Sequence, residues 1–139
     1  MSSTIWRGET VEIDADTVEL RVPASAAYLA VIRTTTAGLA ARLDLTLDEI
    51  EDLRIAVDEA CGLLLGRGCQ DDDTLTARFR IHPDSLEVEV AGPASELPDD
   101  SSYAWALLRA LAGEVATGTS AGVSGSWIRL LHRAGRSAW

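Results

Sequence analysis

Two short stretches near the middle of the chain alternate apolar and polar residues, and this alternation constrains the fold more than any other feature. Residues 75–81 and residues 86–90 each place an aliphatic or aromatic side chain at every second position. Only a short Pro-containing segment around residues 83–84 separates them. The pattern predicts two antiparallel strands joined by a two-residue hairpin loop. Each strand then has one apolar face, which a second layer of structure must cover.

The charged residues of this hairpin indicate its register. With a two-residue loop, Arg80 faces Glu87 and Arg78 faces Glu89 across an exposed surface. Opposite charges directly across two strands favour that pairing. The apolar residues of both strands then share the other face.

Two segments before the hairpin have the spacing of amphipathic helices. The first, residues 24–43, contains no Pro and repeats its larger residues at helical intervals. The second begins with a capping box, because the Thr46 hydroxyl can accept from the amide of Glu49 while the Glu49 carboxylate reaches back. Either Gly66 or Gly68 can end this helix. Its apolar stripe consists of Ile50, Leu53, Val57, Ala60, Cys61 and Leu64.

The remaining elements complete an α+β pattern. Alternation and capping signals predict strands at 11–14, 18–22, 115–117 and 126–132, a turn at 14–17 and a third helix at 103–112. The order β-β-α-α-β-β-α-β-β predicts a two-layer sandwich with the helices on one face of a mixed, mostly antiparallel sheet. The length of 139 residues fits one domain over 1–139, with 133–139 as a frayed tail.

Composition excludes several classes of function. The chain has 12 basic and 22 acidic residues, a net charge of −10, which disfavours direct nucleic-acid binding and suits a partner with a basic face. All the basic residues are Arg, so the lysine of a P-loop, of a protein-kinase ATP site or of a Schiff base is missing. No apolar run approaches the roughly 20 residues of a membrane span. Two cysteines are too few for a disulfide scaffold, and a cytoplasmic location is the expectation.

The cysteines, the histidines and Trp105 could each take part in a metal or ligand site, but their positions in the sequence fit ordinary structural roles. Cys61 and Cys69 have no His partner at metal-ligand spacing, so no metal site is expected. His82 and His132 each close a predicted strand and are expected at the surface. Trp105 is expected in the core, with an aromatic plug in a ligand site as the alternative.

The second helix carries the residues with the most functional interest. Asp58 and Glu59 lie mid-helix, where Glu59 can polarise a water or accept a proton, or can belong to the acidic edge of a solvated helix. The chain over 18–65, most clearly at 43–50 and 53–61, resembles the anti-sigma factor and serine-protein kinase family, which has the histidine-kinase-like (GHKL) ATPase fold. Residues 107–115 resemble the helix that follows the family's ATP lid.

The resemblance implies a nucleotide site that this chain has altered. In the family the stretch beginning at Glu59 is the box Glu-Ala-x-x-Asn, whose Glu orients or activates the reacting group. Leu63 stands in place of the magnesium-binding Asn and has no oxygen to offer a hard cation. The resemblance implies cofactor contacts at Asp58, Glu59, Gly62, Leu63 and Gly92.

Two further nucleotide boxes also depart from the family. Where the family has Asp-x-Gly-x-Gly, residues 90–95 contain Gly92 alone and no Asp. Residues 101–105 contain no Gly where the family wraps phosphates. The chain is therefore expected to keep the fold and to bind ATP and magnesium weakly or not at all.

The resemblance also implies protein partners, namely an alternative sigma factor and an anti-anti-sigma (STAS-domain) protein. Arg33 aligns with an arginine of the family's partner surface, with Tyr28 and Arg42 beside it. A guanidinium there can clamp a partner carboxylate, although an ordinary exposed helix residue gives the same pattern. The family also forms dimers near its N-terminus, where Trp6 is an interface candidate.

Three functions follow from these observations. The first is an anti-sigma factor that sequesters a sigma factor until its antagonist releases it. The second is a magnesium- and ATP-dependent serine kinase that phosphorylates that antagonist. The third is a non-catalytic partner subunit of an active paralogue. Leu63 and the missing glycines favour the first over the second.

Overall fold

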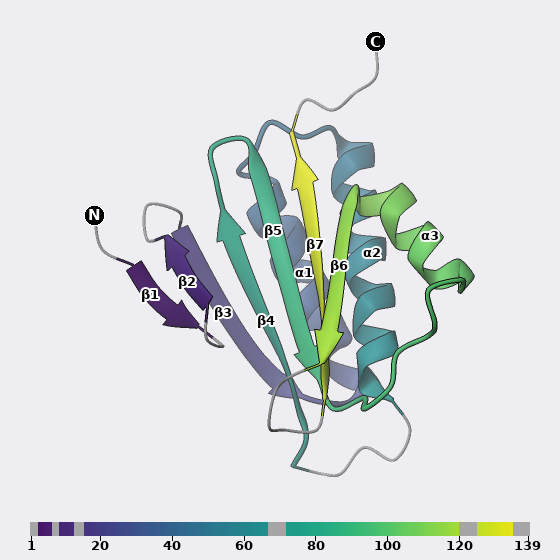
Figure 1. Ribbon diagram of the computed structural model, residues 1–139. Helices are drawn as coiled ribbons and strands as arrows, with labels where there is room; N and C mark the ends of the chain where they lie inside the picture. Colours follow the sequence, from purple (N-terminus) through teal and green to yellow (C-terminus); the bar gives the residue numbers. More distant parts are fainter. Residues whose placement is uncertain (1–2, 7–8, 13–15, 67–71, 120–124, 135–139) are drawn as a thin grey trace.

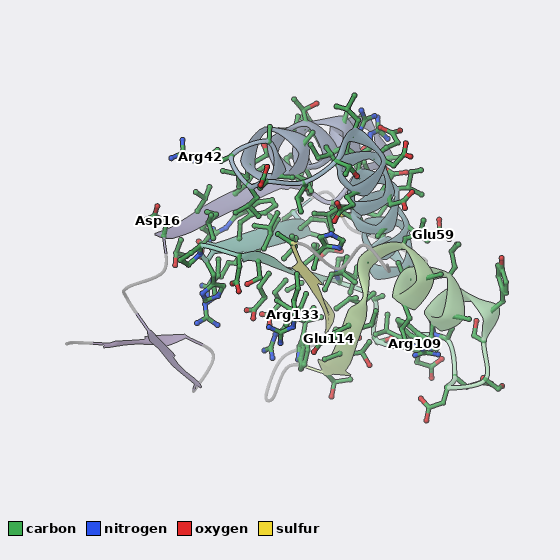
Figure 2. All side chains as sticks on the ribbon, turned by 90° about the horizontal axis from the view of Figure 1, so that it is seen from above. Asp16, Arg42, Glu59, Arg109, Glu114 and Arg133 are labelled. Carbon is green, nitrogen blue, oxygen red and sulfur yellow. The ribbon has the colours of Figure 1, made fainter. Side chains whose placement is uncertain are left out.

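A computed structural model describes residues 3–6, 9–12, 16–66, 72–119 and 125–134. Its main body has two layers, with helices against one face of a five-stranded sheet (Figures 1 and 2). The elements are β1 (Ser3–Trp6), β2 (Glu9–Glu12), β3 (Asp16–Pro23), the 3-10 turn η1 (Ala26–Tyr28), α1 (Leu29–Ala40), α2 (Leu47–Leu65), β4 (Thr74–Ile81), β5 (Ser85–Gly92), α3 (Tyr103–Ala112), β6 (Glu114–Thr119) and β7 (Ser126–Arg133).

The strand order of the large sheet is β3-β4-β5-β7-β6, and every pairing among the described strands is antiparallel. The predicted α+β sandwich is confirmed. The hairpin of β4 and β5 has the predicted register, with Arg80 opposite Glu87 and Phe79 opposite Val88. The amide of His82 donates to the carbonyl of Ser85 at 2.9 Å and closes the two-residue loop.

The N-terminal strands differ from the prediction. β2 at 9–12 pairs with β1 in a separate two-stranded sheet, whereas a strand was expected at 11–14 and a turn at 14–17. Residues 13–15 lie outside the described part of the chain. β3 begins at Asp16 and pairs with β4, placing Val18 opposite Phe79. The pairing of β3 with the distant β4 is favoured over a hairpin with the preceding strand because it turns the apolar residues of β3 and β4 toward the helices.

The predicted strands at the other end are slightly short. β6 spans 114–119 and β7 spans 126–133, so β7 extends into the predicted tail, where Arg133 pairs with Ser85. Residues 135–139 lie outside the described residues. None of the described helices is long and apolar enough to cross a membrane.

The central helix α2 organises the core. Its capping box forms as predicted, with the Thr46 hydroxyl and the Glu49 carboxylate each accepting a backbone hydrogen bond of 3.1 Å. Gly66, at a φ of 66°, ends the helix in the left-handed region that favours glycine. The buried stripe of α2 packs against the sheet, and its fully buried members include Leu53, Val57, Ala60 and Leu64.

Candidate functional site

Asp58 and Glu59 are neighbours in sequence but lie on different sides of α2. Asp58 is half-buried beside α1, whereas Glu59 is exposed and extends from α2 on the side of α3 (Figure 2). Among the described residues, no hydrogen bond or ion pair joins Glu59 to another side chain. The carboxylate that the resemblance assigns to catalysis is therefore free to meet a solute.

Asp58 is bound by a residue of the predicted partner surface. The Arg33 Nη1 donates to Asp58 Oδ1 at 2.8 Å, and both side chains are about one-third exposed, 36% and 38%. Arg33 belongs to α1 and Asp58 to α2, and these helices pack side by side. The predicted partner surface and the predicted nucleotide box therefore meet at one ion pair.

The other predicted partner residues lie toward the two ends of α1. Tyr28 precedes the helix and is 43% exposed, while exposed Arg42 follows its C-cap. A 12-residue helix is about 18 Å long, so Tyr28 and Arg42 cannot contact the same small group. Figure 2 shows Arg42 and Glu59 on opposite sides of the helical layer. Of the three, only Arg33 makes a charged contact with the box.

Leu63 has a packing role. Its side chain is half-buried and packs against the hydrophobic core, while Gly62 is exposed. A hydrocarbon at this position cannot ligate magnesium. Nothing lies within 4 Å of a Cβ built on Gly62, so this glycine is not required by packing.

Gly92 lies where the end of β5 touches the end of α2. A Cβ on Gly92 would lie 2.7 Å from the carbonyl oxygen of Leu64. Two residues on, the amide of Ala94 donates to that same oxygen at 2.9 Å, and the Ser126 hydroxyl donates to the carbonyl of Ala94 at 2.7 Å. The backbone after β5 is thus held against α2 and β7, where the resemblance places an adenine-binding box.

The segment before α3 is held by the helix itself. Trp105 is 5% exposed, as expected of a core residue, and its indole Nε1 donates to the carbonyls of Pro98 at 3.1 Å and Asp99 at 2.9 Å. The Asp99 carboxylate accepts from the hydroxyl and the amide of Ser101, and these bonds lower the pKa of Asp99. The region of the third box is therefore tied to its own helix.

Among the cavities lined by described residues are three that include neither residues 58–63 nor Gly92. The first, of about 260 Å³, lies between the start of α2 and the end of α3 and includes Glu49 and Arg109. A second, of about 230 Å³, is on the face of the sheet away from the helices. The third, of about 210 Å³, lies beside Trp105.

His132 is a residue that the sequence reasoning misplaced. It was expected at the surface, but it is 8% exposed. Its Nδ1 lies 3.1 Å from the carbonyl oxygen of Ala112, and its Nε2 lies 2.9 Å from Glu49 Oε2. The bond to His132 is the largest cause that lowers the pKa of Glu49. The sequence did contain a signal for burial: His132 is two residues after Leu130 and four after Ile128, so it lies on the same buried face of β7.

The uncovered face of the sheet carries ion pairs between neighbouring strands. Arg80 pairs with Glu87 at 3.2 Å, as its register predicts. Arg78 pairs with Glu19 of β3, and the Glu89 carboxylate pairs with Arg129 of β7 at 2.8 Å. Glu89 is buried rather than on an exposed surface. The predicted register is confirmed, and charged residues of the hairpin also pair with the strands on either side of it, β3 and β7.

The fold and the altered box on α2 together define a histidine-kinase-like ATPase domain. The profile of the family described as "Histidine kinase-like ATPase domain" matches residues 22–130, and the chain belongs to this family. The expected fold family is confirmed.

More specific similarity is to proteins named serine-protein kinase RsbW. The chain is 44% identical to that of Bacillus subtilis over 80 residues, 56% of this chain and 50% of the relative. It is 34% identical to that of Halalkalibacterium halodurans over 86 residues, 62% of this chain and 53% of the relative. The chain spans about half the length of the curated relatives it matches.

A solved structure shares the fold. The RsbU and RsbW domains of Rv1364c from Mycobacterium tuberculosis match with a TM-score of 0.64 at 18% identity. The match covers 88% of this chain and 34% of that chain. At this identity the likeness supports the two-layer architecture alone.

Proposed function

We propose that this chain is an anti-sigma factor-like regulator. It binds and sequesters an alternative RNA polymerase sigma factor, and an anti-anti-sigma (STAS-domain) protein competes for the same surface. The observation that carries the proposal is the surface of η1 and α1, where Arg33 is the one charged side chain between residues 26 and 41. The similarity to serine-protein kinase RsbW supports it.

This surface has the composition of an interface centre. Apart from Arg33, its exposed residues are Ala, Thr and Gly with two larger side chains, Tyr28 and Val31, each just over 40% exposed. Interface centres are depleted in charge and enriched in Tyr and Arg. The net charge of −10 over the whole chain adds long-range attraction to a basic partner and speeds association.

The altered boxes favour binding over catalysis. Leu63 offers no oxygen to magnesium, and Gly92 is packed against Leu64 rather than open to adenine. Partner binding on α1 needs neither residue. We therefore expect the sigma factor to bind with the same affinity in the presence and absence of magnesium-ATP.

The test is a titration of the full chain with each purified alternative sigma factor of its source organism, by biolayer interferometry, with and without magnesium-ATP. Arg33→Ala should weaken binding by roughly thirtyfold or more, the loss expected of an interface Arg hot spot. Arg109→Ala, an exposed arginine on α3, is the matched control and should bind like the wild type. A chain that binds no sigma factor, or binds only with nucleotide, contradicts the proposal.

A serine kinase acting on the anti-anti-sigma protein is the second candidate. It is favoured by the relatives' name and by the exposed carboxylate of Glu59. Phosphate transfer from labelled ATP to the STAS protein that disappears in Glu59→Gln would establish it. Leu63→Asn should restore magnesium-nucleotide binding if the remaining site is open. If Leu63→Asn bound magnesium-nucleotide no better than the wild type, the packing at Gly92 would also have to prevent nucleotide binding.

The homodimer and the role of Trp6 remain proposals of the same kind. A mixed dimer with a kinase-active paralogue on size-exclusion chromatography would support the subunit function instead. Strict self-association would count against that alternative.

A further inference from the structure

We infer that Asp58 is a positioning residue for partner binding, which holds the Arg33 guanidinium in the orientation that meets a carboxylate of the partner. The inference rests on the proposed function, because it concerns the same surface. It gives a role to a residue that the family resemblance assigned to the nucleotide.

The geometry places the two groups in a defined pair. The bond from Arg33 Nη1 to Asp58 Oδ1 is 2.8 Å long and joins residues 25 positions apart on two packed helices. A guanidinium has five N–H donors, and this bond uses one nitrogen. With 36% of the Arg33 side chain exposed, donors remain for a partner carboxylate.

The nearby arginine on α2, Arg54, does not pair with Asp58 in place of Arg33. Arg54 lies four residues before Asp58 on α2 and could compete for it, but its Nη1 pairs with Glu51 at 3.4 Å. The carboxylate of Asp58 therefore serves α1 rather than its own helix.

Positioning has a predictable effect on affinity. An arginine that is already oriented loses less conformational freedom when the partner arrives, and immobilising one such side chain costs roughly a factor of two to ten in affinity. The opposite mechanism is competition, in which the partner carboxylate must displace Asp58. The two mechanisms predict opposite signs, because removal of Asp58 weakens binding under positioning and tightens it under competition.

A double-mutant cycle tests the inference in the same sigma-factor titration. Asp58→Ala should weaken binding by roughly two- to tenfold in the wild-type background and should have no effect in the Arg33→Ala background. Asp58→Asn keeps an acceptor oxygen without the charge, so its affinity for the sigma factor should lie between those of the wild type and of Asp58→Ala. Asp48→Ala removes an exposed carboxylate in the first turn of α2, away from Arg33 and Arg54, and should bind like the wild type.

The outcomes separate this inference from the function on which it rests. Unchanged or tighter binding by Asp58→Ala overturns positioning, and so does an Asp58→Ala effect that persists without Arg33. Thermal melts of all variants identify any loss of folding, and the Asn variant then carries the test. A wild-type chain that binds no sigma factor overturns the proposed function and this inference together.

Discussion

Replacing Gly92 with alanine adds one methyl group where the backbone of β5 approaches the end of α2. The new Cβ would lie 2.7 Å from the Leu64 carbonyl oxygen and 2.7 Å from Cδ2 of Leu75. Leu75 is fully buried, and the Leu64 oxygen already accepts a hydrogen bond from Ala94. Neither group can move freely, so the overpacking should lower the free energy of unfolding by about 1–3 kcal/mol.

Gly38→Ala is the matched control. Gly38 lies inside α1, and nothing is within 4 Å of a Cβ built there. Replacing a helix-interior glycine with alanine should raise the free energy of unfolding by about 0.5–1 kcal/mol. In a chain of this length 1 kcal/mol moves the Tm by about 3–4 °C. Calorimetry should therefore show the two alanine variants shifting the Tm in opposite directions.

The reasoning is refuted if Gly92→Ala melts at or above the wild-type temperature. Gly92 would then not be required by packing against Leu64 and would be available for the ligand contact that the family resemblance implies. An ATP titration of the wild type and the variant would follow in that case. If Gly92→Ala lowered the affinity for nucleotide without lowering stability, Gly92 would be a nucleotide-binding residue rather than a packing residue.

Two further predictions concern contacts that join the layers. Because the bond to His132 lowers the pKa of Glu49 below its ordinary 4.5, this carboxylate stabilises the fold fully above that pH and progressively less as the pH falls through the lower folded value. Glu49→Gln keeps an acceptor for the Thr46 amide, so the Tm gap between wild type and variant should shrink on acidification, and a pH-independent gap would contradict the reasoning. Trp105→Phe keeps an aromatic ring in the core but removes the indole donor, which should cost about 1 kcal/mol in urea unfolding and speed amide exchange at 101–105. Unchanged exchange there would show that the indole does not hold this segment.

Features with local signals were predictable from the sequence. The β4–β5 hairpin follows from strict alternation around a two-residue loop, and the start of α2 follows from the spacing of Thr46 and Glu49. Each signal lies within a few residues of the contact it predicts. The helix-on-sheet arrangement then follows, because every amphipathic element must bury its apolar face.

Features that depend on distant residues were not predictable. Val18 of β3 pairs with Phe79 of β4, and among the described residues β3 does not pair with the strand that precedes it in the sequence. Which strand is the better partner depends on the apolar faces of all the strands in the sheet, and the local sequence does not show this. His132 was placed by its position at a strand end, although the phase of its alternation pointed into the core. The Arg33–Asp58 pair has no sequence signal, because the angle between two helices decides which surface residues meet.

The structure gives a physical reason why partner binding and nucleotide chemistry can separate in this chain. Asp58 and Glu59 are adjacent in sequence, yet consecutive helical residues point about 100° apart. Asp58 therefore belongs to the surface shared with α1, and Glu59 to the surface beside α3. Substitutions on the Glu59 side, such as a leucine at position 63, do not alter the side of α2 that supports Arg33. Under the proposed function, a chain of this fold can thus carry Leu63 where the resemblance expects a magnesium-binding Asn and still keep the α1 surface proposed for the partner.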